Sequence, residues 1–265
     1  MYYFIFEQAR NKWQAAFQNK IISNLEELQI IGEVARANPI QKPPELFQMG
    51  IKKGYNTIVA AGSDTIINSL GALTAKQGIT LGIIPIETKS SFFSLIGCEN
   101  WEQACQALPK RRVETFDIGK INKDKIFLTF VKIQPENKNM AQIILDFKKF
   151  KVEVPTLEII VTNGVLENAD PKIVRKSFSD GLLDIFIPTE LLKDSASVIS
   201  LLFQEKTKPI FSSLFRTKKV KISSEEKTFK IISPDNKIIA KTPCEISIIP
   251  KAIRIIIKKA VRFLK

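Results

Sequence analysis

Residues 55–97 constrain the fold more than any other part of this chain. They begin with an apolar strand, Thr57–Ala61, followed by a tight turn at Gly62–Asp64 and a segment of helical length. A second apolar strand, Leu81–Ile86, leads into a polar loop. A strand that runs into a small-residue turn and then a helix directs backbone N–H groups at one point, the usual arrangement for holding phosphate. The sequence therefore predicts an anion-binding turn here.

Strand and helix patterns alternate through the first hundred or so residues. Tyr2–Phe6 is aromatic and β-branched, which predicts a strand, and apolar residues recur every four positions from Gln8 to about Leu28, which predicts a helix. A second strand is expected at Ile30–Val34 and a helix at Glu45–Lys53. Such alternation is typical of a parallel sheet with covering helices. We expect an α/β protein with a Rossmann-like nucleotide-binding domain at residues 1–124.

The rhythm changes after about Lys125. Short segments there alternate or carry β-branched residues between turns, which favours antiparallel sheet. The expected strands are Ile126–Ile133, Phe150–Val154, Leu157–Thr162, Val220–Ile222, Phe229–Ile232 and Ile246–Ile249, with a helix at Glu190–Phe203. We predict a C-terminal antiparallel β-sandwich domain at residues 125–250 and a basic segment, 251–265, that packs back on the first domain.

Composition excludes several kinds of chemistry. Histidine is absent, which removes histidine metal sites, Ser-His-Asp and Cys-His catalysis and a histidine general base. The three cysteines, Cys98, Cys105 and Cys244, form no CxxC pair, which indicates a reducing cytosol; each is otherwise a small buried apolar residue. The chain shows neither a signal peptide nor an apolar run of the roughly eighteen residues that span a bilayer, so we expect a cytoplasmic protein.

The charge predicts polyanionic partners. Forty Lys and Arg residues against 27 Asp and Glu give a net charge of +13, which attracts nucleotides, nucleic acids or anionic membranes. Aromatic RNA-binding motifs and an uninterrupted basic arm are missing, which argues against nucleic acid. Residues 251–265 contain no acid, so they could rest peripherally on the inner membrane face or form a solvated basic face. A homodimer is also left open.

The turn and the second strand resemble the diacylglycerol kinase catalytic family, which includes bacterial lipid kinases and sphingosine kinases and is related to NAD kinases. VAAGSDTIIN is similar to the signature GGDGT-x-N-E, with matches at Gly62, Asp64 and Asn68. LGIIPIETKSSFFSLIG is similar to LGIIPLGTGNDFAR-x-LG, with matches that include Thr88 and Phe92. The resemblance implies that ATP binds at Gly62, Ser63, Asp64, Thr65, Asn68 and Thr88.

The same phrases also depart from the family pattern. Ser63, Thr65 and Lys89 replace glycines, and a side chain at a position of close backbone approach should obstruct phosphate. In the family the first strand leads into an Asn-Pro-x-Ser-Gly phosphate turn, whereas here it runs into Glu7-Gln8-Ala9-Arg10. These departures favour a site that has lost part of its nucleotide machinery.

Two later sequence phrases resemble the family's metal-binding segment and the segment that carries its general base. Residues 177–184, SFSDGLLD, resemble the family's D-G-x-L-D, which implies Mg²⁺ held through water by Asp180, with Ser177 and Leu182 as backbone donors. The alternative is that Asp180-Gly181 forms only the turn that opens a strand at 182–188. The family's general-base glutamate falls on Lys237, which cannot accept a proton while protonated. Asp235 is a possible substitute, and a plain hairpin turn is the alternative.

Two functions follow from the resemblance. The first is ATP-dependent phosphoryl transfer to a lipid hydroxyl in the cleft between the two domains, with Mg²⁺ neutralising the developing charge. The second is a catalytically inactive relative that retains a lipid- or nucleotide-binding pocket as a regulatory module.

Overall fold

The computed structural model describes residues 1–88, 90–137, 139–164, 178–188, 211–234 and 236–258. In the first part strands and helices alternate: β1 (Tyr2–Phe6), α1 (Lys12–Glu27), β2 (Gly32–Arg36), α2 (Pro43–Lys52), β3 (Thr57–Gly62), α3 (Asp64–Gln77), β4 (Thr80–Pro85), α4 (Phe92–Ile96) and α5 (Trp101–Ala107). The strands that follow are β5 (Val113–Ile121), β6 (Lys125–Phe127), β7 (Phe130–Pro135), β8 (Ala141–Asp146), β9 (Lys151–Thr156), β10 (Ile159–Thr162), β11 (Leu183–Pro188), β12 (Phe211–Thr217), β13 (Lys219–Ser223), β14 (Phe229–Ile232), β15 (Ile238–Lys241) and β16 (Cys244–Ile256).

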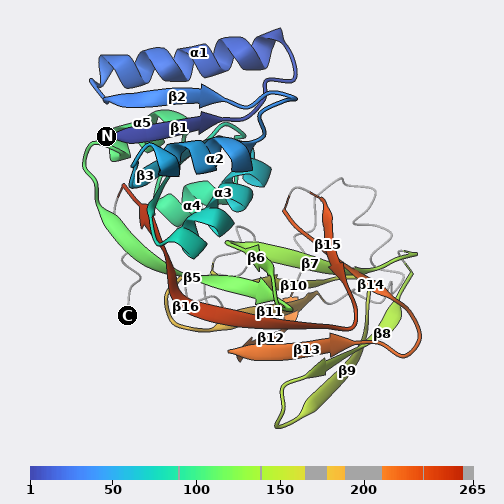
Figure 1. The fold of residues 1–265 in the computed structure, drawn as a ribbon. Coiled ribbons are helices and arrows are strands. Elements are labelled where there is room, and N and C mark those ends of the chain that lie inside the picture. Colours follow the sequence, from blue (N-terminus) through green and yellow to red (C-terminus); the bar gives the residue numbers. More distant parts are fainter. Residues whose placement is uncertain (89, 138, 165–177, 189–210, 235, 259–265) are drawn as a thin grey trace, which may run out of the picture.

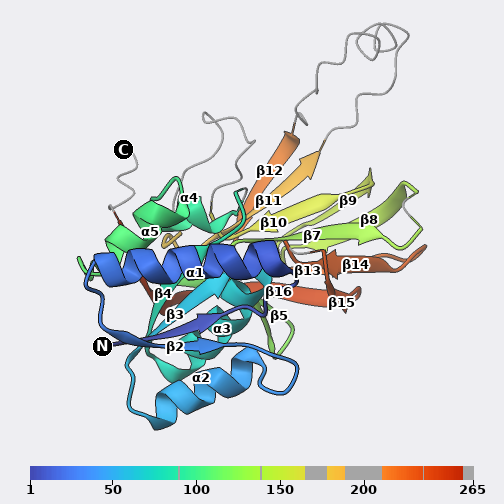
Figure 2. The same ribbon diagram turned by 90° about the horizontal axis from the view of Figure 1, so that it is seen from above.

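The first four strands form a parallel sheet in the order β2-β1-β3-β4. Alternate residues of β1 point to opposite faces: Tyr2, Phe4 and Phe6 pack with α1 and α5, whereas Tyr3 and Ile5 pack with α2, α3 and α4. Figure 2 shows α1 and α2 on opposite sides of these strands. Because both faces are covered, β1, β3 and β4 are buried along their whole length. The predicted α/β class is confirmed.

This sheet, sheet A, continues from β4 through β16, the last strand in the described part of the chain. Its order is β2-β1-β3-β4-β16-β13-β8-β9; β5 also pairs with β16, and β6 pairs with β5. β16 pairs in parallel with β4 at Arg254 and Ile255 and antiparallel with β5 and β13. Residues 251–256 therefore continue β16 alongside β4 and β5. The boundaries at 124 and 250 stay predictions, and residues 259–265 lie outside the described part.

Sheet B is antiparallel and packs against the second half of sheet A (Figure 1). Its order is β12-β11-β10-β7-β14-β15. Side chains from both sheets share one apolar core, which includes Val131, Ile133, Ile143, Leu145, Ile185, Val220, Ile231 and Ile246. The predicted antiparallel second half is confirmed.

Several predicted elements differ in detail. The expected strand Ile126–Ile133 is two strands, because β6 pairs with β5 in sheet A whereas β7 pairs with β10 and β14 in sheet B. One apolar run thus contributes strands to both sheets. The period of a sequence pattern does not show which strand each part of the run will pair with. The sequence did not predict β8, β12 or β15. The expected helix Glu190–Phe203 lies outside the described residues. Among the described helices, none is both long and apolar enough to cross a membrane.

Candidate functional site

The predicted strand, turn and helix lie at the carboxyl end of the parallel sheet. Gly62 ends β3, Ser63 is the N-cap of α3, and Asp64 begins the helix. Ser63 has φ −70° and ψ 167°, an extended conformation that any residue adopts, so its side chain causes no backbone strain. The first backbone N–H groups of α3 lack partners within the helix and therefore face this turn.

A carboxylate of the same chain already occupies the turn. Glu7, directly after β1, accepts a hydrogen bond from the Ser63 N–H (2.8 Å, to Oε2) and another from the Ser63 hydroxyl (3.0 Å, to Oε1). Arg10 lies 3.3 Å from the same carboxylate, whose side chain is only 15% exposed. A Cβ at Gly62 would lie 2.8 Å from the Glu7 Cβ, so glycine permits this close approach. The N-terminus of α3 carries the positive end of the helix dipole and attracts negative charge, which the Glu7 carboxylate supplies.

Asp64 is buried and joins three segments. It accepts hydrogen bonds from the hydroxyls of Ser90 (2.5 Å) and Ser91 (3.1 Å), in the loop between β4 and α4. The Ser91 hydroxyl also contacts the Thr129 hydroxyl at 3.2 Å, in the turn between β6 and β7. Asp64 is only 7% exposed, and its carboxylate links α3 to both sheets through these serines.

The remaining predicted nucleotide residues are only partly brought together. Asn68 follows Asp64 by one helical turn, donates to the Asp64 carbonyl (2.9 Å) and accepts from the Leu128 N–H (3.2 Å). Thr65 is half-buried in the first turn of α3. Thr88 is exposed, in the loop that also carries Ser90. Ser63, Asp64 and Asn68 thus make hydrogen bonds within the chain around the start of α3.

Strand register brings the later phrases to one edge of sheet B. Phe130 pairs with Thr162, Thr162 with Asp184, and Asp184 with Arg216. β14 ends beside the start of β7, because Ile232 pairs with Lys132. Three segments therefore leave sheet B on the same side, at the strand ends: the residues after Thr162, the residues before Leu183 and the β14–β15 turn. On this side Thr129 connects the sheet to α3 and α4.

The candidate metal segment forms a turn. Asp180 is exposed and accepts a hydrogen bond from the Leu182 N–H at 3.0 Å, as an aspartate does in a tight turn. Ser177 lies outside the described residues. Across the described part of the chain, no group of three or more acidic or cysteine side chains is placed to hold a metal. The exposed Asp180 carboxylate is therefore engaged in a turn, and a Mg²⁺ ion held there would need several waters to complete its shell.

Asp184, on the adjoining strand, is buried and paired. Its Oδ1 lies 2.9 Å from the Arg216 Nε. Burial raises the pKa of Asp184 to about 6, while Arg216 opposes the rise and the nearby charge of Asp180 adds to it. The Asp184 carboxyl therefore changes its protonation around pH 6.

The sequence did not single out Asp117, which is 1% exposed and connects several segments. Its carboxylate accepts hydrogen bonds from the N–H groups of Gly181 (2.6 Å) and Lys251 (2.8 Å), and its carbonyl accepts one from Asn163 (2.5 Å). The phrases Phe116-Asp117-Ile118-Gly119 and Asn163-Gly164 were the available signals, although neither reveals that these residues meet.

Lys237, at the family's base position, is exposed at the end of a hairpin turn. The Ser233 N–H and hydroxyl both donate to the Lys237 carbonyl, at 2.9 and 3.1 Å, and Asn236 takes a left-handed conformation with φ 61°. β14 and β15 pair antiparallel on either side. Asp235 lies outside the described residues. The backbone here is that of a hairpin turn.

Comparisons with known proteins agree with this architecture. Residues 2–121 match the family model of the diacylglycerol kinase catalytic domain. No curated protein matches significantly. Three solved structures from Bacillus anthracis str. Sterne share the fold. Two candidate diacylglycerol kinases have TM-scores of 0.75 and 0.73, with 19% and 17% identity, and the alignments cover 98% and 96% of both chains. A third, described as a diacylglycerol kinase, has a TM-score of 0.74 and 20% identity over 98% of both chains.

The resemblance read from the sequence is therefore confirmed: residues 2–121 match the diacylglycerol kinase catalytic domain family, and the described chain has the fold of these three bacterial proteins.

Proposed function

We propose that this chain is a non-catalytic relative of the diacylglycerol kinases, a regulatory module that binds a lipid between the start of α3 and the adjoining edge of sheet B. The observation that carries the proposal is the Glu7 carboxylate on the Ser63 N–H and hydroxyl, at 2.8 and 3.0 Å. A nucleotide phosphate needs the same donors, and two anions at one turn repel each other. The residues present therefore do not fit the phosphates of ATP.

The base position supports the same proposal. Lys237 stands where the resemblance requires a glutamate, and it lies exposed in a hairpin turn. An ammonium group has no lone pair with which to accept a proton from a lipid hydroxyl. Binding of a lipid, in contrast, requires neither a base nor a phosphate-binding turn.

A second candidate is an ATP-dependent lipid kinase of the diacylglycerol kinase type. The match over residues 2–121 favours it, as does Asp64, which two serine hydroxyls hold next to the turn. In that case Mg²⁺ would depend on Asp180, with Ser177 and Leu182 as backbone donors. Substitution of Asp64 or Asp180 would then abolish turnover.

The test combines calorimetry with a phosphoryl-transfer assay on one preparation. We expect the wild-type protein to retain lipid from a mixed extract, to give no heat with millimolar Mg·ATP and to transfer no phosphoryl group. Glu7→Ser frees the Ser63 donors and should make Mg·ATP binding measurable, whereas Glu27→Gln, an exposed carboxylate on α1, should change nothing.

Transfer by the wild-type protein that is lost in Asp64→Asn and Asp180→Asn would establish the kinase instead. If the wild-type protein binds Mg·ATP as well as Glu7→Ser does, Glu7 does not block the turn. Failure to retain any lipid would refute the lipid-binding proposal even if ATP turnover is absent.

A further inference from the structure

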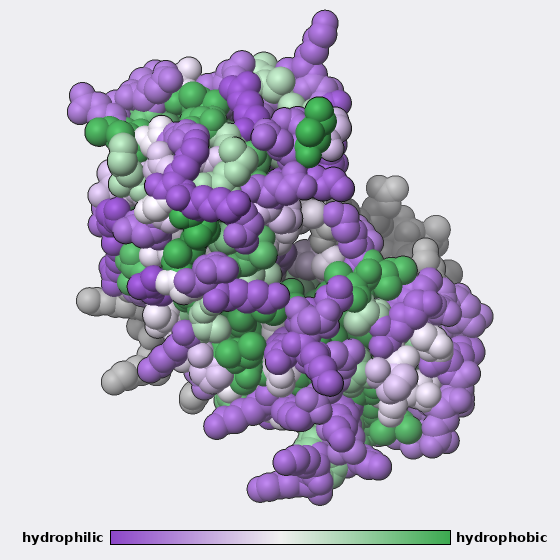
Figure 3. All heavy atoms as spheres, viewed as in Figure 1, coloured by the Kyte–Doolittle hydropathy of each residue, from purple (hydrophilic) through white to green (hydrophobic). Residues whose placement is uncertain are grey.

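A cluster of aromatic and basic side chains lies where the β8–β9 hairpin meets the β12–β13 turn. We name it the basic aromatic patch, and it comprises Phe147, Phe150, Phe215, Lys148, Lys149, Lys151, Lys218, Lys219 and Lys221. Figure 1 shows the β8–β9 hairpin at the lower end of the molecule, away from the helices, and hydrophilic residues dominate that end in Figure 3.

The aromatic part combines a half-buried base, Phe147 and Phe215, with an exposed tip, Phe150. Phe147 stacks on Phe150 with ring centres 4.8 Å apart, and it lies 5.3 Å from the ring of Phe215. Phe147 and Phe215 pack against the core between the sheets, whereas Phe150 is 51% exposed. Burial of an exposed phenylalanine ring at the tip of a hairpin is favourable, so Phe150 can act as an apolar anchor.

The lysines surround this anchor. A groove of about 580 Å³ beside it is lined by Phe147, Thr217 and the lysines 148, 218, 219 and 221, together with Asp146 and Glu245. Both acids have basic partners, since Lys219 lies 2.7 Å from Glu245 and Lys151 lies 3.9 Å from Asp146. In the groove four lysines face two acids, and Lys149 and Lys151 of the patch lie beside it, so positive charge is in excess.

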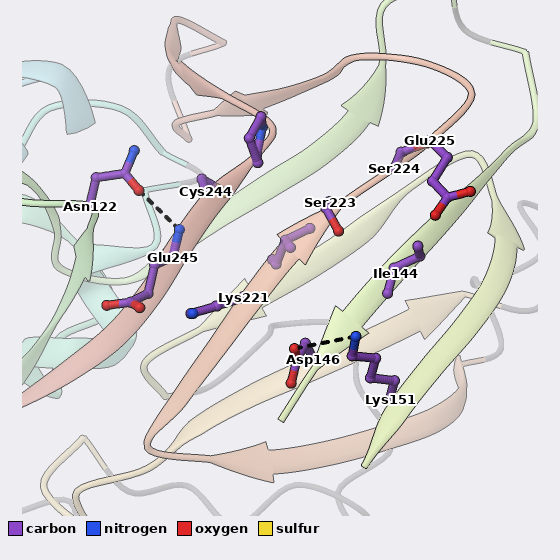
Figure 4. Close-up of a pocket in the computed structure, with 12 residues that line it drawn as sticks. Asn122, Ile144, Asp146, Lys151, Lys221, Ser223, Ser224, Glu225, Cys244 and Glu245 are labelled. Carbon is purple, nitrogen blue, oxygen red and sulfur yellow. Dashed lines mark hydrogen bonds and ion pairs between the residues drawn. The ribbon is translucent and has the colours of Figure 1, made fainter. Parts of the chain in front are cut away.

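A neighbouring hollow has a volume of about 480 Å³. Figure 4 shows four charged residues around it, on adjacent strands: Lys151, Asp146, Lys221 and Glu245. Lys151 pairs across the strands with Asp146, Asp146 with Lys221, and Lys221 with Glu245. These four residues form a row of alternating charge across neighbouring strands. Such pairs of opposite charge stabilise the ends of the strands. The lysines at its margin, 148, 149 and 218, are exposed beyond it.

We propose that the basic aromatic patch docks the protein on an anionic lipid bilayer. Charge complementarity selects this occupant: lysines bind anionic head groups, while Phe150 enters the interfacial layer. The surface is distinct from the C-terminal segment 251–265, and it does not depend on catalytic activity. Thr217 in the groove pairs with Leu183, so the patch adjoins the strand that follows Asp180. Docking there brings that edge of sheet B close to the membrane.

The test is co-sedimentation with vesicles of phosphatidylcholine containing about 30% phosphatidylglycerol, against phosphatidylcholine alone. We expect the wild-type protein to bind only the anionic vesicles. Lys148→Gln/Lys149→Gln/Lys218→Gln should lower the partition coefficient about a hundredfold, since each lysine near an anionic leaflet contributes roughly fivefold. Phe150→Ser should lower it several-fold and should matter most at high salt, where screening weakens the lysines.

The matched control is Lys52→Gln/Lys76→Gln/Lys110→Gln, which removes three exposed lysines from the α/β part and should leave binding unchanged. Equal loss in the control and patch variants would overturn the proposal, as would a wild-type protein that ignores anionic vesicles. Light scattering distinguishes a second copy as the occupant: a wild-type dimer that Phe150→Ser dissociates would also overturn it. Circular dichroism confirms that each variant is folded.

Discussion

Asp117 accepts a hydrogen bond from the Gly181 N–H at 2.6 Å, although 64 positions separate the two residues. The same buried carboxylate accepts from the Lys251 N–H at 2.8 Å. It thereby holds the Asp180-Gly181 turn and the bend of β16 against β5. Asparagine can accept at only one of its two terminal atoms, so one backbone N–H loses its partner.

We expect Asp117→Asn to lower the free energy of unfolding by about 2 kcal/mol, because it leaves a buried donor unsatisfied. Urea unfolding measures the difference. Asp124→Asn is the control, since that side chain is 72% exposed, and it should remain within about 0.5 kcal/mol of wild type. Equal stability of the Asp117 variant would show that the two N–H groups find other acceptors.

Gly119 lies opposite Phe127 where β5 pairs with β6. A Cβ at this position would lie 2.0 Å from the Phe127 ring, which is buried. We expect Gly119→Ala to cost about 2 kcal/mol of unfolding free energy through overpacking. In a Phe127→Leu background the same substitution should cost less, and a double-mutant cycle by urea unfolding measures that coupling. Additive effects would contradict the contact.

Asp184 gives stability a definite pH dependence. Its pKa of about 6 in the folded protein exceeds the value of about 4 expected in the unfolded chain. Between these values the folded state binds a proton that the unfolded state has released, so the contribution of Asp184 to stability falls as pH rises from 4 to 6.

Asp184→Asn should therefore flatten the pH profile of unfolding free energy in that interval, by roughly 2–3 kcal/mol. Chemical denaturation at several pH values measures this slope, with Asp124→Asn as the reference. A variant profile parallel to wild type would mean that folding does not raise the pKa of Asp184.

The thiols should be unreactive in the folded protein. Burial raises the pKa of Cys98 to about 11 and those of Cys105 and Cys244 to about 12. Because the thiolate is the nucleophile, a disulfide reagent at pH 8 should modify none of them until the chain unfolds. Three thiols should then react in denaturant. Rapid reaction of a native thiol would reveal an opening near that cysteine.

Local pattern predicted several strands well, both in the parallel part of sheet A and in the antiparallel sheet B. Tyr2–Phe6 and Phe229–Ile232 have the predicted bounds, because apolar runs between polar turns define each of them. The contacts that define the site depend on residues far apart in the chain, such as Glu7 with Ser63 and Asp117 with Gly181. The sequence shows that Glu7 stands where the resemblance expects a phosphate-binding turn. It does not show that the Glu7 carboxylate will bind a turn some fifty residues later in the chain.

The position of β16 also sets an order of events during synthesis. β16, residues 244–256, lies between β4 and β13, yet its partner β4 ends at Pro85. The ribosome delivers the amino-terminal strands first, so the edge of β4 stays unpaired while more than a hundred further residues emerge. An unpaired parallel edge is a template for other chains. The amino-terminal sheet therefore completes its β4 edge only after β16 has been synthesised.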